Sequence, residues 1–423
     1  MRSKIFVVLV LLVAMFCLIV TFNGIVLAED PEGEEELFSN STSPDALILL
    51  DLSGSMDWNP AGGSNVYGDS TCAGPFYSAS GTGHTVNCSR RQIAKRAIFD
   101  ILDDTGDQVI NSADFNSLAV RIGYMRFYNC SADDTGGSYS SGCNSLIKKI
   151  STIGQTTATT YQSIYCSASS TGSCTKSSSV FGSVSGESAN GGTALASGLK
   201  EAKLYLDAHK AGDAARDCRQ KFVIVISDGA DTYACSGDGS ETQTSQYKRR
   251  RESVAAIKAL ADAGYRVFVI GFGSGMPSYL QNTLNWMAYY GQTDNPEADN
   301  KGIPASNIPP YNLTGTNLYP AGLSSCSTST TTATCNDSAG ATGAGTCATA
   351  DDPATLRLRG YAFLATDADE LSLALKQAMT IIRQTNYSFS QSSVQSTRTT
   401  DENFIYEGSF EPQANEPFWR GHL

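Results

Sequence analysis

Residues 45–56 read DALILLDLSGSM, and this stretch decides the fold. Its five consecutive apolar residues, Ala46–Leu50, are short enough for a strand and match one that is buried on both faces of a sheet. The strand delivers Asp51, Ser53 and Ser55 into the loop at its C-terminal end. Because ligands of open α/β sheets bind at that edge, the loop is a candidate functional site.

Outward from this strand, short apolar runs alternate with amphipathic stretches. Four further strands are predicted at residues 118–127, 222–226, 266–270 and 361–365. Helices are predicted where apolar positions share one helical face, at residues 93–102, 195–206, 254–261 and 371–382. Before the last helix, Asp367 can cap the free amides and Glu370 can reach back. This alternation predicts a doubly wound, Rossmann-like α/β fold with a mostly parallel sheet.

Three polar regions interrupt the alternation and are predicted to be surface insertions, at residues 57–90, 129–190 and 291–352. They hold nine of the eleven cysteines that follow Cys17. Disulfides that pin loops in an oxidising compartment fit this arrangement. The expected couples are Cys72 with Cys88, Cys130 with Cys143, Cys166 with Cys174, and Cys218 with Cys235, and Cys326, Cys335 and Cys347 leave one thiol over.

The N-terminus has the pattern of a secretory signal peptide at residues 1–28. Arg2 and Lys4 precede a long uncharged apolar run, and Val26-Leu27-Ala28 precedes an acidic segment. We expect cleavage after Ala28. The apolar run is also long enough for an uncleaved membrane anchor, and in both cases the rest of the chain is exported.

Residues 29–44 are predicted to be an acidic linker, followed by one domain at residues 45–385. The net charge of the chain is −12, and loss of Arg2 and Lys4 with the signal makes it −14. So acidic a protein is a poor partner for nucleic acid or an anionic membrane surface.

Two further loops bring oxygen donors toward the edge where Asp51, Ser53 and Ser55 lie. Thr193 opens a predicted helix within NGGTAL, and Asp228 follows a buried strand within KFVIVISDGADT. Carboxylates and hydroxyls are hard donors that suit Mg²⁺, Mn²⁺ or Ca²⁺. Zinc is not expected, because the three histidines are scattered and closely spaced cysteines are missing. The alternative is a turn of Asp and Ser residues with no ion.

The order of these residues resembles the metal-ion-dependent adhesion site of the von Willebrand factor A family, which has a DxSxS motif, a distant Thr and a distant Asp. The resemblance implies that Ser53, Ser55 and Thr193 contact the metal directly and that Asp51 and Asp228 hold it through water. It also implies Mg²⁺ as the first choice of cation, with an acidic group of a protein ligand in the open position. Two carboxylates, each one water removed, leave the cation under-neutralised, which attracts such a group.

The tail at residues 386–423 contains NFIYEGSFEPQANEPFWRGHL from Asn403 onward. It resembles the link between the A-type domain and the β-propeller in type IV pilus tip proteins of the PilC/PilY family, and Phe410, Pro412, Trp419, Gly421 and Leu423 carry the match. The sequence stops at Leu423 before that propeller, so we expect the chain to be either the N-terminal piece of a split or truncated gene or a short member that works with a separate propeller protein. The resemblance implies a protein of the bacterial periplasm, cell surface or pilus tip, with minor pilins or a separate propeller protein as partners.

Catalysis is not expected, since no Ser–His–Asp arrangement, phosphate loop or dinucleotide fingerprint is present in the sequence. An organic cofactor and a small-molecule substrate are not expected either. The sequence predicts a metal-dependent adhesion or protein-binding module of type IV pilus assembly or the pilus tip. The alternative is a structural or mechanosensing component of the pilus machinery, for which the metal site is not needed in assembly.

Overall fold

The computed structural model describes twelve stretches of the chain. They are residues 42–61, 88–130, 141–147, 149–153, 160–165, 174–175, 187–235, 237–240, 246–299, 357–385, 409–411 and 420–422. The predicted signal peptide, most of the linker, much of each insertion and most of the tail lie outside them. No helix within these stretches is long and apolar enough to cross a membrane.

The chain divides into two units. Thr42–Tyr387 contains a six-stranded sheet, and Met1–Ser41 together with Ser388–Leu423 makes up the other unit. In the second unit the described elements are two short strands, β9 (Ser409–Glu411) and β10 (Arg420–His422), which pair antiparallel with Phe410 opposite Gly421.

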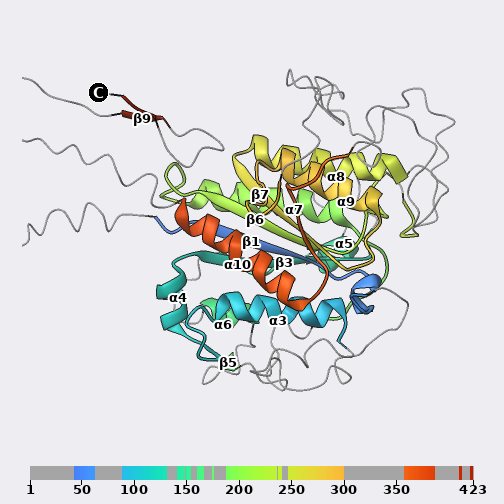
Figure 1. Cartoon of the computed structure of the whole chain (residues 1–423), viewed down its shortest axis with the longest axis horizontal. Coiled ribbons are helices and arrows are strands. Elements are labelled where there is room, and N and C mark those ends of the chain that lie inside the picture. The colour runs from blue at the N-terminus through green and yellow to red at the C-terminus, as the bar shows by residue number, and fades with distance from the viewer. Residues whose placement is uncertain are drawn as a thin grey trace, which may run out of the picture. The chain divides into compact units, whose positions relative to one another are not determined.

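The sheet is mostly parallel, with β1 at its centre (Figure 1). From edge to edge its order is β4-β3-β1-β6-β7-β8. Every neighbouring pair is parallel except β3 with β4. The strands are β1 (Asp45–Asp51), β3 (Arg121–Phe127), β4 (Lys149–Ser151), β6 (Lys221–Ser227), β7 (Tyr265–Phe272) and β8 (Phe363–Ala365). The predicted doubly wound α/β fold is confirmed.

Helices cover both faces of this sheet (Figure 1). Ala46, Ile48 and Leu50 of β1 belong to one core, whereas Leu47 and Leu49 belong to the other, and all five are fully buried. This is why the central strand reads as an unbroken apolar run. The first core contains α3 (Arg90–Leu102), α6 (Thr160–Tyr165) and α10 (Ala368–Gln384), and the second contains α7 (Leu195–Gly212), α8 (Gln246–Asp262) and α9 (Ser278–Tyr290).

Local signals explain where two of these helices begin. Ser89 and Gln92 form a reciprocal capping box at the start of α3. Asp367 accepts hydrogen bonds from the amides of Asp369 and Glu370 at the start of α10, so the predicted cap is confirmed. By contrast, α7 begins at Leu195 without a side-chain cap, which leaves the hydroxyl of the nearby Thr193 available for another role.

Several described elements have no counterpart among the predicted ones. The strand expected at residues 118–127 begins only at Arg121, because α4 (Ser112–Leu118) precedes it and ends on Ala119 in a left-handed conformation. Within the predicted insertion at residues 129–190, β4 extends the sheet and α6 contributes buried tyrosines. The other unpredicted elements are β2 (Val109–Ile110), α5 (Ser141–Leu146), β5 (Cys174–Thr175) and α9.

One expected cysteine couple is confirmed and one is wrong. Cys130 and Cys143 form a disulfide. Cys88, Cys174 and Cys235 are also disulfide-bonded, but Cys218 is a free, exposed thiol. Cys218 precedes β6 and Cys235 follows it, so a strand of seven residues separates them. Such a strand spans about 20 Å, far beyond the Cα separation of about 6 Å that a disulfide allows.

Candidate metal centre at the carboxyl edge of the sheet

Asp51 organises the first loop of the candidate site. It is the last residue of β1, and the short 3-10 helix η1 (Gly54–Asp57) follows. Its Oδ1 accepts a hydrogen bond of 2.8 Å from the amide of Ser53, and its Oδ2 accepts one of 2.7 Å from Ser227 Oγ. These two contacts hold the turn in which Ser53 and Ser55 are presented.

The Thr193 loop is held against the first loop by backbone hydrogen bonds. The amide of Gly54 donates to the carbonyl of Gly191 over 2.7 Å, and the amide of Asn190 donates to the carbonyl of Leu52 over 2.8 Å. Thr193 itself is tied to Thr232, whose Oγ1 accepts from the Thr193 amide at 2.9 Å. Thr193 is buried although it lies in a loop, which fixes its side chain near the sheet edge.

The three loops bring all five predicted residues together. Ser53 Oγ and Ser55 Oγ lie 3.2 Å apart, and Ser55 Oγ donates a hydrogen bond of 2.8 Å to Asp228 Oδ1. A Cβ atom placed on Gly229 would lie 3.0 Å from Thr193 Oγ1 and 3.9 Å from Ser55 Oγ. Gly229 therefore keeps open the space between these hydroxyls, which a side chain would fill.

The site concentrates negative charge away from water. Asp51 and the side chain of Asp228 are both fully buried. Burial raises the pKa of Asp51, and the neighbouring Asp228 carboxylate raises it further. Burial also raises the pKa of Asp228, and the guanidinium of Arg90 offsets this only in part.

Arg90 is a member of the site that the sequence analysis missed. It is the first residue of α3, and its Nη1 lies 2.6 Å from Asp228 Oδ2. In the sequence it is one of two adjacent arginines at a helix start, and nothing in that pattern connects it to a loop 138 residues away. The structure thus places one protein cation against Asp228, one of the two buried carboxylates.

These features fit a divalent cation of the hard class. The donors are carboxylate and hydroxyl oxygens, which Mg²⁺, Mn²⁺ and Ca²⁺ prefer. Two buried carboxylates faced by one guanidinium leave a negative surplus that a cation would neutralise. Gly229 leaves room between Ser55 and Thr193. The residues that could hold the ion are therefore Asp51, Ser53, Ser55, Thr193 and Asp228.

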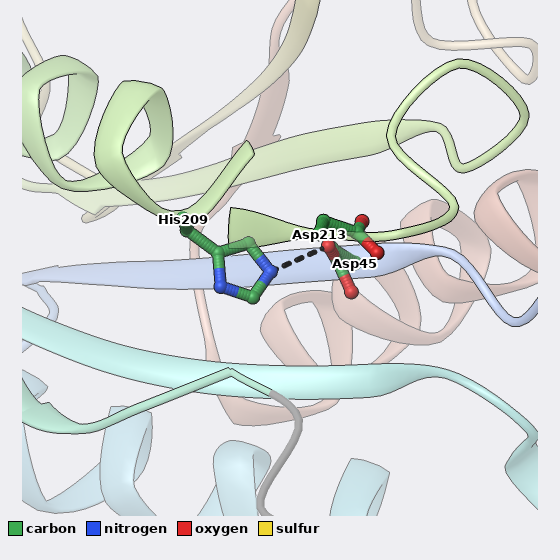
Figure 2. Close-up of side chains that lie close together, drawn as sticks. All are labelled: Asp45, His209 and Asp213. Carbon is green, nitrogen blue, oxygen red and sulfur yellow. Dashed lines mark hydrogen bonds and ion pairs between the residues drawn. The ribbon is translucent and has the colours of Figure 1, made fainter. Parts of the chain in front are cut away.

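A second cluster of possible ligands lies at the opposite end of β1 (Figure 2). Single ligand atoms of Asp45, His209 and Asp213 lie within 4.8 Å of one another. His209 Nε2 is 2.8 Å from Asp45 Oδ2. Asp45 begins β1, whereas His209 and Asp213 come from the end of α7, and no sequence signal connects them.

Protein cations already compensate the carboxylates of this second cluster. Arg121 lies 2.9 Å from Asp45, and Lys221 lies 3.6 Å from Asp45 and 2.9 Å from Asp213. Burial opposes ionisation of Asp213, but hydrogen bonds and charge from Lys221 and Arg219 outweigh it, so its pKa lies below its ordinary value. An added divalent cation would meet these positive groups at short range, so the cluster fits a structural ion-pair network better than a metal site.

Comparison with known proteins agrees with this architecture. The von Willebrand factor type A domain family matches residues 148–292. Residues 148–292 therefore match that domain family within the doubly wound α/β fold described above. The matched residues contain Thr193 and Asp228, whereas Asp51, Ser53 and Ser55 precede them. No curated protein matches the sequence.

Several solved structures are similar to this chain at low identity. The pilus adhesin SpaC from Lactobacillus rhamnosus GG is 16% identical over 59% of this chain and 28% of its own, with a TM-score of 0.36. The PilB minor pilin from Streptococcus sanguinis is 13% identical over 81% of this chain and 62% of its own, with a TM-score of 0.35. The manganese-loaded TRAP protein from Plasmodium vivax is 13% identical over 56% and 59%, with a TM-score of 0.27. The chain thus spans less than two thirds of the length of each.

Proposed function

We propose that this protein is a metal-dependent adhesion or protein-binding module. The observation that carries the proposal is the convergence of five oxygen-bearing residues from three loops at one edge of the sheet. Ser55 Oγ bonds Asp228 and lies beside Ser53 Oγ, while Gly229 keeps the space toward Thr193 open. Such an arrangement suits the binding of a partner through a bound cation.

Each residue has a distinct part in this function. Ser53, Ser55 and Thr193 would offer hydroxyl oxygens to the ion, and Asp51 and Asp228 would supply the charge that retains it. When bound, a Mg²⁺ ion offers an open coordination position to an acidic side chain of the partner. The backbone bonds from Gly54 to Gly191 and from Asn190 to Leu52 keep the loops in place before the partner arrives.

The proposed setting is an exported bacterial protein of the type IV pilus machinery, acting in pilus assembly or at the pilus tip. The support is the resemblance of the tail to the PilC/PilY family. In that tail, Phe410 and Gly421, which carry part of the resemblance, lie opposite each other in the β9–β10 pair. The proposed partners are minor pilins or a separate propeller protein.

Calorimetric titration of the purified protein with Mg²⁺, Mn²⁺ and Ca²⁺ tests the metal site. We expect saturable binding that Thr193→Val abolishes, because the substitution removes a hydroxyl and keeps the shape of the side chain. The matched control is Thr283→Val, since Thr283 is equally buried but its hydroxyl bonds a carbonyl within α9. No binding by the wild type, or equal loss in both variants, would reject the metal site.

An experiment in cells distinguishes adhesion from the structural alternative. In a bacterium that carries the gene, we expect Thr193→Val to reduce surface attachment while the protein is still exported. If pili assemble and attach normally with Thr193→Val but not without the protein, the chain is a structural component whose metal site is dispensable.

A further inference from the structure

A cavity of about 270 Å³ adjoins the proposed metal site. Its walls come from the loops after β1 and β6, the end of β7 and the loop that follows it, and the starts of α3 and α9. Ser55, Arg90 and Asp228 form a polar end that is shared with the metal site. The remaining wall is mainly apolar and includes Trp58, Phe272, Met276, Pro277, Tyr279 and Leu280.

The size of the cavity suits one side chain. Pockets that hold a whole small-molecule ligand usually measure roughly 300–1,000 Å³. A volume of about 270 Å³ falls just below that range. Buried pockets with aromatic walls are typical of the sites where one anchor residue of a protein partner binds. The cavity therefore fits a single large apolar side chain better than a complete small molecule.

Arg90 gives the polar end a second positive charge beside the proposed ion. Its side chain is 9% exposed, and its Nε is buried without a hydrogen-bond partner among the described residues. The guanidinium lies against Gly273, where an added Cβ would be 3.2 Å from Arg90 Cζ. Gly273 has a φ of 143°, a backbone conformation that favours glycine. A buried donor without a partner is free to bond an incoming carboxylate.

Charge and shape together specify the partner. A divalent ion and Arg90 carry three positive charges against the two negative charges of Asp51 and Asp228, which leaves an attraction for one carboxylate. We propose that the cavity is a specificity subsite for a partner segment in which an acidic residue is followed by a large apolar residue. This inference rests on the proposed function. The carboxylate is recognised beside Ser55 and Arg90, and the apolar side chain enters the cavity between Trp58 and Tyr279.

The test uses a matched series of blocked dipeptides titrated by NMR into the purified protein in saturating Mg²⁺. The probes are N-acetyl-Glu-Phe-amide, N-acetyl-Glu-Gly-amide and N-acetyl-Gln-Phe-amide. Burial of a phenyl side chain should tighten Glu-Phe over Glu-Gly by roughly 10- to 100-fold. Gln-Phe should bind more weakly than Glu-Phe, because it lacks the carboxylate.

Two variants separate the parts of the subsite. Gly275 lines the cavity and an added Cβ there meets nothing within 4 Å, so Gly275→Leu fills the cavity without backbone strain. It should remove the advantage of Phe over Gly and leave Mg²⁺ affinity unchanged. Gly212→Leu, at an equally open position ending α7, is the control. Arg90→Gln should weaken both Glu peptides by a similar factor.

The outcomes distinguish this inference from the function on which it rests. If the wild type binds no Mg²⁺, both the proposed function and the subsite are rejected. If Mg²⁺ binds but Glu-Phe and Glu-Gly bind equally, or if Glu-Phe does not bind, the subsite is rejected and the metal site stands. An advantage of Phe that survives Gly275→Leu would also reject the cavity as its source.

Discussion

The two ends of β1 carry the same kind of residue in opposite electrostatic situations. At its start, Asp45 is fully buried but contacts Arg121, Lys221 and His209. At its end, Asp51 is also fully buried, yet its charged neighbour is another carboxylate, Asp228.

The difference separates stability from binding. Cations of the chain neutralise the carboxylates at the start of the strand, so that end is complete without any ligand. At the other end a buried negative surplus persists, which lowers the stability of the folded chain and which a bound cation would neutralise. A binding site of this kind lowers the stability of the folded chain locally, at the edge of a fully packed sheet.

Removal of the charge at Asp45 should have the largest effect on stability. Asp45→Asn leaves Arg121 and the buried Lys221 with fewer partners, and breaking such a pair typically costs about 3–5 kcal/mol. Urea unfolding measures the loss. The control is Asp262→Asn, because Asp262 is exposed and its pair with Lys258 should contribute less than about 1 kcal/mol. Equal losses of stability from both substitutions would show that the buried ion pairs of Asp45 contribute no more than an exposed pair.

The same substitution at the other end of β1 should raise the stability of the folded chain. In EDTA, Asp51→Asn removes one of two buried like charges and keeps the acceptor for the Ser53 amide. We expect the free energy of unfolding to rise by on the order of 1–2 kcal/mol. In saturating Mg²⁺ the wild type should gain stability and the variant should not. A loss in EDTA as large as that of Asp45→Asn would show that Asp51 is a purely structural residue.

Stability should also depend on pH in opposite ways at the two ends. The folded pKa of Asp51 is raised to about 7, above its ordinary value, so stability in EDTA should fall as pH rises from about 4 to about 7. The pKa of Asp213 is lowered, so its contribution is present above about pH 4 and is lost as pH falls below that.

Melting temperatures at about pH 5 and pH 8, with EDTA or Mg²⁺, measure this dependence. Mg²⁺ should abolish the fall toward pH 8, because it stabilises the ionised carboxylates. Asp51→Asn should flatten the profile in EDTA. A wild-type profile in EDTA that rises toward pH 8 would contradict the predicted sign.

The smallest effect should come from His209. His209→Gln keeps a group that can donate to Asp45, and Arg121 and Lys221 remain, so we expect a loss below about 1 kcal/mol. Zn²⁺ or Mn²⁺ should give no stabilisation that depends on His209. If either metal stabilises the wild type and His209→Gln removes the effect, this end of the strand is a metal site and the contrast between the ends disappears.

Much of the fold could be predicted because the signals are local. The central strand is an apolar run that two sheet faces bury, and Asp367 caps α10 as its position suggested. Asp51 and Asp228 each follow a predicted strand, so their loops were placed at one edge, which parallel strands share, and Thr193 was placed at the start of a helix. The helix α9, which carries no charged residue, was missed although several of its buried residues share one helical face.

The sequence by itself determined which loops follow buried strands and which oxygen donors those loops carry. Only the tertiary structure decided which charges meet. It placed Arg90 on Asp228, gathered Asp45, His209 and Asp213 among cations, and separated Cys218 from Cys235 by the length of β6. The physical reason is the separation along the chain over which each kind of interaction acts. Burial and periodicity act on neighbouring residues, whereas ion pairs and disulfides depend on distances that the chain sets only after the sheet has formed.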